Sequence, residues 1–267
     1  MDTAMTPAAR LALLPPIRRA RLWRLYAEGT AEGRQRRFLD LWMDGGRSIL
    51  GAKGTGLGTA AKAAIDMGLA RPLPSVWTRR LEKALLETYP GFASARLFPN
   101  RDRALAALGA AFPGAEPALL RPFGEHLRGN APADSRFALP LLPCPALLEP
   151  GVVLAREGAD AEALAAEQVP PAALAAAARA LREFAAFSRV FGEGLWRKAD
   201  RRLAPYFERS GPYLYPRCPE TEYDTLFRAA LGAGLLLSPE YAFPSILPGD
   251  FDDGELAALG KAISANA

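Results

Sequence analysis

The stretch from Phe38 to Leu108 constrains the fold most, because its turn residues fix an order of elements. Bulky residues alternate from Phe38 to Trp42 and predict a strand. Asp44-Gly45-Gly46 then predicts a hairpin turn, with a second strand returning over residues 47–50. A run of alternating glycines, residues 51–58, leads from this hairpin into the rest of the stretch.

Helices are expected to dominate the remainder of that stretch. A helix over residues 59–68 should end at Gly68, and Ser75 is a good N-cap for a helix over residues 76–88. A short strand at residues 95–98 precedes a third helix. This mixture of strands and helices predicts a mixed α/β fold.

Both ends of the chain carry further elements. Residues 17–28 are expected to form an amphipathic helix decorated with arginines, because Leu22, Leu25 and Tyr26 keep helical spacing. The proline-rich residues 113–150 predict loops and short strands. The other expected elements are strands at residues 136–142 and 151–155, helices at 172–191, 195–207 and 221–232, strands at 211–215 and 234–239, an extended segment at 241–246, and a terminal helix from Asp252.

The formal net charge of +4 comes mostly from arginines near the N-terminus. Together with Trp23 and Tyr26 they could form a nucleic-acid surface, but a solvated helix face is the favoured interpretation. Two cysteines are too few for a disulfide framework, and the sequence offers neither a signal peptide nor an apolar span of 18 residues. We therefore expect a cytoplasmic protein without a membrane segment.

The order of elements resembles the class III aminotransferases, pyridoxal-phosphate enzymes of the glutamate-1-semialdehyde aminotransferase type. The likeness covers residues 20–108 and 170–260, including the Gly234-Leu235-Leu236-Leu237-Ser238-Pro239 strand. It implies a reduced, truncated pyridoxal-phosphate-transferase-like α/β fold with a C-terminal α+β small subdomain. The implied division is a helical arm (1–37), an aminotransferase-like segment (38–112), a shortened central region (113–170) and a small-domain-like segment (171–267).

The segment around Asn100 departs from the family where the cofactor phosphate would be held. The family has an Asn-Ser-Gly-Thr-Glu-Ala loop there, whose backbone N–H groups hold the phosphate. Here Asn100 is followed by Arg101-Asp102-Arg103. Asn100, Arg101 and Arg103 are thus candidates for an anion site, with arginine charge replacing the loop. The simpler interpretation is a solvated helix start.

The glycine run offers a second candidate for phosphate binding. Gly54 and Gly56 could present backbone amides to an anion ahead of a helix. Their spacing matches neither a P-loop nor a full dinucleotide-binding pattern. A structural turn is therefore the favoured interpretation.

The lysines bear directly on chemistry, because the family forms a Schiff base through one. The chain has five, Lys53, Lys62, Lys83, Lys198 and Lys261, and none lies in a segment like the family's lysine segment. The residues after the strand at 151–155 are Arg156-Glu157, where the resemblance implies an aspartate for the pyridine nitrogen. Lys53 and Lys198 are the remaining candidates for catalysis. No metal site is expected, since His126 is the only histidine.

These observations leave two hypotheses open. The first is a degenerate aminotransferase-like protein without Schiff-base chemistry, which acts as a binding or regulatory protein, either for a small anionic ligand or through dimerisation. The alternative is an active pyridoxal-phosphate-dependent aminotransferase or aminomutase with a displaced lysine. Pyridoxal phosphate as a cofactor and a homodimer are implied by the resemblance alone. Nucleic acid is an unfavoured partner.

Overall fold

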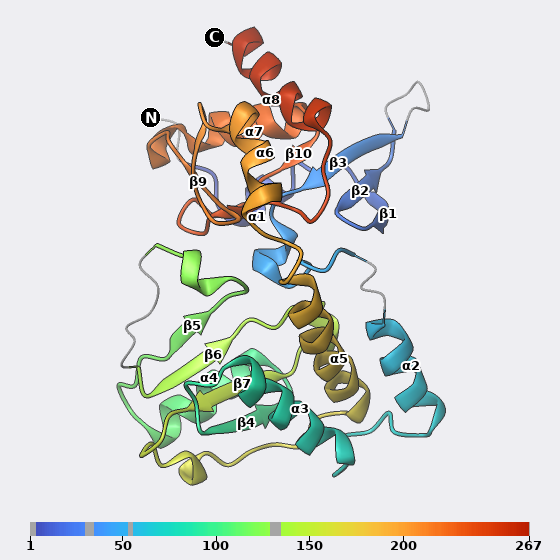
Figure 1. Ribbon diagram of the computed structural model, residues 1–267, viewed down its shortest axis with the longest axis vertical. Coiled ribbons are helices and arrows are strands. Elements are labelled where there is room, and N and C mark those ends of the chain that lie inside the picture. The colour runs from blue at the N-terminus through green and yellow to red at the C-terminus, as the bar shows by residue number, and fades with distance from the viewer. Residues whose placement is uncertain (1–3, 30–34, 53–55, 129–134, 267) are drawn as a thin grey trace. The chain divides into compact units, whose positions relative to one another are not determined.

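The computed structural model describes residues 4–29, 35–52, 56–128 and 135–266. It contains two compact units (Figure 1). The first is formed by residues 1–53, 126–128 and 190–267, and the second by residues 54–125 and 129–189. The division after residues 37, 112 and 170 remains a prediction.

The second unit is built on a four-stranded sheet in the order β4-β7-β6-β5. Strand β7 runs antiparallel to both β4 and β6, and β5 runs parallel to β6. Every residue of β6 and β7 is buried, which explains their continuous apolar sequences. The strands are β4 (Ser94–Phe98), β5 (Ala118–Leu120), β6 (Phe137–Pro140) and β7 (Gly151–Ala155).

Helices of the second unit pack on this sheet and on one another. In α4 (Arg101–Ala111), Ala104 and Leu108 join a core with Phe98 and Val153. Helix α5 (Pro171–Phe187) packs against both α2 (Leu57–Asp66) and α3 (Val76–Thr88) (Figure 1). Small side chains let α2 and α5 approach closely, and their contact is formed by Ala61, Ala64, Ala172, Ala175 and Ala176.

The first unit combines two small sheets with helices from both ends of the chain. One sheet has the order β1-β2-β3-β10 and the other β11-β9-β8. Its strands are β1 (Ile17–Arg21), β2 (Arg24–Ala27), β3 (Arg36–Asp40), β8 (Phe207–Ser210), β9 (Tyr213–Pro216), β10 (Leu235–Leu236) and β11 (Ser245–Ile246). Its helices are α1 (Pro7–Leu11), α6 (Glu193–Leu203), α7 (Tyr223–Gly232) and α8 (Asp253–Asn266).

Most expected elements are confirmed, but two near the N-terminus are wrong. The expected helical arm over residues 17–28 is instead the antiparallel pair β1 and β2. Residues 47–50 form turns and no strand, since a 3-10 helix, η1 (Met43–Gly46), follows β3. Strand β3 pairs with β2 and, in parallel, with β10.

Candidate functional site

The N-terminus of α4 lies where the resemblance predicts a cofactor phosphate. The Asn100 side chain accepts a hydrogen bond from the backbone N–H of Arg103 at 2.9 Å, so it caps the helix itself. Asp102 adds an acidic side chain to the first turn, which complements the helix dipole. Asp102 therefore supplies the negative charge, and Asn100 the hydrogen-bond acceptor, that a bound phosphate would otherwise provide at this helix end.

Arg103 is directed to a partner within the same unit. Its Nη2 lies 2.7 Å from Oε1 of Glu167, and its Nε donates to the same oxygen at 2.9 Å. Arg101, the first residue of α4, is half-buried. The structure thus brings Asn100, Arg101 and Arg103 together on one helix turn, with Arg103 already neutralised.

Gly151 further shapes this turn. A Cβ at Gly151 would lie 2.0 Å from the backbone oxygen of Asn100, so only glycine fits at the start of β7. The backbone of residue 100 is therefore packed directly against β7.

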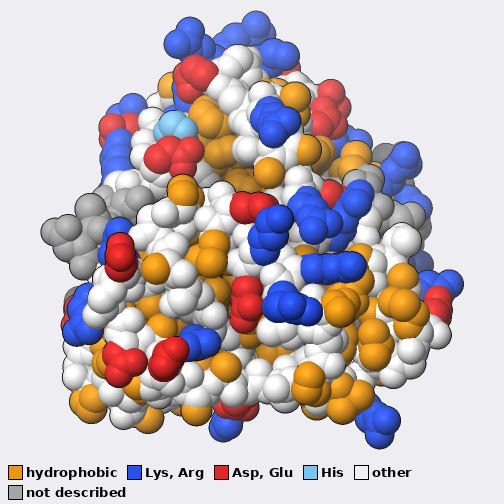
Figure 2. Space-filling model, turned by 60° about the horizontal axis from the view of Figure 1, so that its bottom comes forward, with side chains coloured by type: hydrophobic (Ala, Val, Ile, Leu, Met, Phe, Trp, Pro, Cys, Tyr) orange, Lys and Arg blue, Asp and Glu red, His pale blue; other side chains and the backbone are white. Residues whose placement is uncertain are grey.

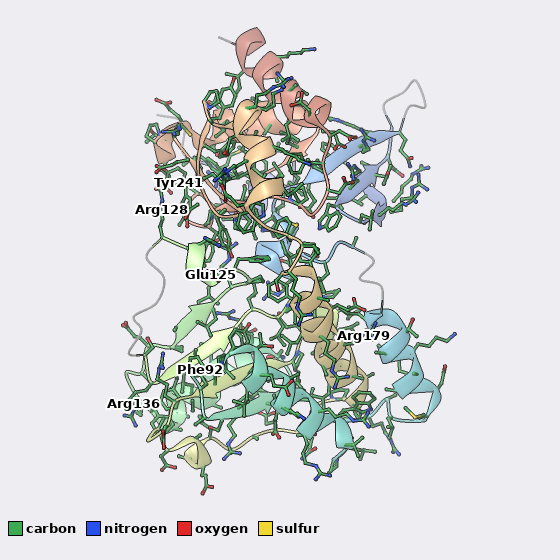
Figure 3. All side chains as sticks on the ribbon, in the orientation of Figure 1. Phe92, Glu125, Arg128, Arg136, Arg179 and Tyr241 are labelled. Atoms are coloured by element: carbon green, nitrogen blue, oxygen red, sulfur yellow. The ribbon has the colours of Figure 1, made fainter. Side chains whose placement is uncertain are left out.

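The glycine run is described only in part, because Lys53 and Gly54 lie outside the described residues. Gly56 precedes α2 and is packed against α5, where a Cβ would lie 2.4 Å from both Arg179 Nε and Glu183 Oε1. Those two side chains form an ion pair at 2.8 Å. In Figure 3, Arg179 extends from α5 on the side of α2. A carboxylate thus already lies beside the N-terminus of α2, which favours the structural turn over a phosphate cradle.

The four described lysines all lie exposed on helices. Lys62 is on α2, Lys83 on α3, Lys198 on α6 and Lys261 on α8. Lys83 lies 3.8 Å from Glu87 one turn along its helix. Lys198 therefore lies in water and not in the desolvated pocket that activates a Schiff-base lysine.

His126, Cys144 and Cys218 each lie in surroundings of their own. His126 packs edge-on against Trp196, with ring centroids 5.2 Å apart. Cys144 is buried, and burial raises the pKa of the half-buried Cys218 thiol. Among the described residues no group of three or more His, Cys, Asp or Glu could hold a metal ion.

The sequence did not point to a polar cavity in the second unit. It measures about 210 Å³ and is lined partly by Thr78 and Glu82 of α3 and by Arg96 of β4. The signals were present but weak. Thr78 and Glu82 are four residues apart on one helix, and Arg96 interrupts an apolar strand.

The chain has relatives of similar sequence, but they do not assign it to a family. No family model matches the chain. It is 28% identical to an uncharacterized protein of Treponema pallidum (strain Nichols), over 87% of this chain and 88% of the relative. It is 25% identical to an uncharacterized protein of Borreliella burgdorferi, over 93% of this chain and 90% of the relative.

Solved structures show the fold. The N-acetylornithine aminotransferase of Stenotrophomonas maltophilia K279a matches with a TM-score of 0.62 and 14% identity, covering 95% of this chain and 96% of that one. The ornithine delta-aminotransferase of Plasmodium falciparum matches with a TM-score of 0.65 and 9% identity, covering 98% and 99%. The predicted fold class is therefore confirmed, with 267 residues being short for this fold. At such identities the likeness concerns the fold alone.

Proposed function

We propose that this aminotransferase-like chain forms no Schiff base and acts as a binding or regulatory protein. One observation carries the proposal: Lys62, Lys83, Lys198 and Lys261 are all exposed on helices. An amine in water is mostly protonated at neutral pH, so it reacts with an aldehyde only weakly and without selectivity. A Schiff-base lysine needs a desolvated or cationic environment, which an exposed helix face does not supply.

The N-terminus of α4 supports the same proposal. Asn100 caps the helix and Arg103 is paired with Glu167, so an incoming phosphate would have to displace both interactions. Asp102 in the same turn would repel it. The cost of this competition weakens any phosphate site built from Asn100, Arg101 and Arg103.

The alternative, an active pyridoxal-phosphate-dependent aminotransferase or aminomutase, depends on Lys53. This lysine lies outside the described residues, in a segment next to the glycine run. Lys198 is a poorer candidate because of its exposure. A homodimer and a cytoplasmic location remain proposals from the sequence and its resemblance. No helix among the described residues is long and apolar enough to cross a membrane.

A cofactor titration tests the proposal. Purified protein is titrated with pyridoxal phosphate while visible absorbance is recorded for the wild type and for Lys53→Ala, Lys198→Ala and, as a control, Lys62→Ala. We expect weak absorbance that does not saturate and is alike in all four proteins, since exposed lysines react with the aldehyde indiscriminately. A saturable one-to-one band that Lys53→Ala or Lys198→Ala alone removes would overturn the proposal.

The surface argues against a nucleic-acid role for the arginines. In the first unit, Arg24 is engaged by Asp250 at 3.0 Å and by Glu255 at 2.8 Å, and Arg37 lies 3.3 Å from Glu255. On the face that Figure 2 shows, some basic side chains lie beside acidic ones and others lie together as a group. Arginines paired with carboxylates have less charge to offer a phosphate backbone.

A further inference from the structure

The polar cavity of the second unit lies between α3, β4 and the segment that precedes α5. The N-cap of α3 contributes Ser75, its first turn Thr78 and its second turn Glu82. Arg96 projects from β4, and Gln168 comes from the segment after the last 3-10 turn of the unit. At about 210 Å³ the cavity has the volume of roughly seven waters, so it suits a small ligand.

Two opposite charges dominate the lining. Burial raises the pKa of the Glu82 carboxyl, while the Arg96 guanidinium opposes that rise. The carboxyl is therefore partly removed from water and lies within the field of Arg96. The other acidic side chain at the cavity, Glu167, is already paired with Arg103.

The polar groups of the lining keep unused hydrogen-bonding capacity. Arg96 donates through Nε to the carbonyl of Ala161 at 2.9 Å, and within the described part of the chain its terminal nitrogens have no acceptor. The side chains of Thr78, Glu82 and Gln168 likewise have no hydrogen-bond partner among the residues that the structure describes. Thr78, Glu82 and Arg96 are half-buried, and half-buried polar groups need water or a ligand to complete their hydrogen bonds, whereas Gln168 is exposed.

We propose that this cavity binds a small zwitterion, whose ammonium pairs with Glu82 and whose carboxylate pairs with Arg96. The lining holds one cation and one carboxylate that is not otherwise engaged, so an overall neutral ligand with both charges satisfies it. A ligand with a single charge would be attracted by one group and repelled by the other. Thr78 and Gln168 add neutral hydrogen bonds to the ligand's charged ends.

The inference rests on the proposed function in one point only: it takes the chain to be a binding protein and names the class of ligand. It is independent of pyridoxal phosphate. The zwitterion site would stand even if the cofactor titration revealed a saturable Schiff base. A failure of the zwitterion site and a failure of the proposed function are therefore distinguishable.

Isothermal titration calorimetry with three matched probe sets tests the site. The zwitterions are glycine, β-alanine and 4-aminobutanoate, the anions are acetate and propionate, and the cations are methylammonium and ethylammonium. We expect saturable binding of at least one zwitterion, about tenfold or more tighter than any probe with a single charge. No saturable zwitterion binding, or equal binding of a probe with a single charge, would overturn the proposal.

Variants locate the binding in this cavity. Glu82→Gln and Thr78→Val remove no hydrogen bond within the described chain, so both are expected to fold, and Glu82→Gln should weaken binding about tenfold or more. Arg96→Gln should weaken it similarly, although this change also removes the bond to Ala161. The control is Glu87→Gln on the exposed side of the same helix, which should bind like the wild type. Unchanged affinity in folded Glu82→Gln would sink the assignment.

Discussion

Arg103 of α4 lies 2.7 Å from the carboxylate of Glu167, which precedes α5. This ion pair takes up an arginine that would otherwise be the strongest candidate for holding a cofactor phosphate. It also holds Glu167, which belongs to the lining of the polar cavity. One contact thus bears on both proposals for this chain.

The first prediction concerns that pair. Arg103→Ala should lower the free energy of unfolding by at most about 1 kcal/mol, because both side chains are partly exposed to water. It should leave the weak, non-saturating response to pyridoxal phosphate unchanged, since the arginine is not expected to hold phosphate. Denaturant unfolding and a cofactor titration measure the two effects. Saturable cofactor binding in the wild type that Arg103→Ala weakens about tenfold would assign Arg103 to a phosphate site instead.

The second prediction concerns Gly151. A Cβ at this position would lie 2.0 Å from the backbone oxygen of Asn100, and a backbone atom has little freedom to move away. Gly151→Ala should therefore cost about 3 kcal/mol of unfolding free energy. Gly58→Ala in α2 is the control, because a Cβ there meets no atom within 4 Å. If both variants were equally stable, the close packing of α4 on β7 would be disproved.

The third prediction concerns Gly56. Here the obstructing atoms belong to Arg179 and Glu183, whose flexible ends can shift, so Gly56→Ala should cost only about 1 kcal/mol. The cost reflects loss of their ion pair. Combining Gly56→Ala with Arg179→Ala should therefore cost less than the sum of the single changes, as measured by a double-mutant cycle. Additive costs would contradict this origin.

The fourth prediction concerns Asp40 at the end of β3. Its carboxylate accepts hydrogen bonds from the N–H groups of Trp42 and Met43, yet burial outweighs them and raises the pKa of Asp40 to about 6. The folded chain therefore holds this proton more tightly than the unfolded chain, so the contribution of Asp40 to stability falls as pH rises from about 4 to 6.

Asp40→Asn removes this titration and keeps an oxygen to accept those bonds. The variant should gain stability relative to the wild type as pH rises through that window. Thermal unfolding across pH 4 to 7 measures the difference. A difference that stays flat with pH would show that Asp40 does not titrate there.

Local signals predicted much of the second unit. Ser75 caps α3 as expected, with its side chain accepting from the N–H of Trp77, and Gly68 ends the preceding helix at a φ of +77°. The apolar run at residues 151–155 is β7. These features depend on interactions between residues that are close in sequence, so local sequence patterns are enough to predict them.

The N-terminal hairpin could not be predicted in the same way. Its turn places Leu22 at a φ of +50°, a conformation usually signalled by glycine or asparagine, and neither is present. The spacing of Leu22, Leu25 and Tyr26 therefore favoured a helix. The pairing of β3 with β10 joins Leu39 to Leu235, a contact that no local pattern encodes.

The candidate site was only partly visible in the sequence. The sequence shows that no lysine lies in a segment like that of the class III aminotransferases, but the exposure of the lysines required coordinates. The pairing of Arg103 with Glu167 joins residues 64 positions apart. The cavity of Thr78, Glu82 and Arg96 depends on how a helix lies against a strand, which spacing alone does not give.

The most direct test of the central claim is intact-mass spectrometry after borohydride reduction. The full-length wild type is incubated with an equimolar amount of pyridoxal phosphate, reduced, and mapped by peptide digestion. We predict a largely unmodified chain, with minor adducts scattered over several lysines. A near-complete single adduct on one lysine would contradict the account.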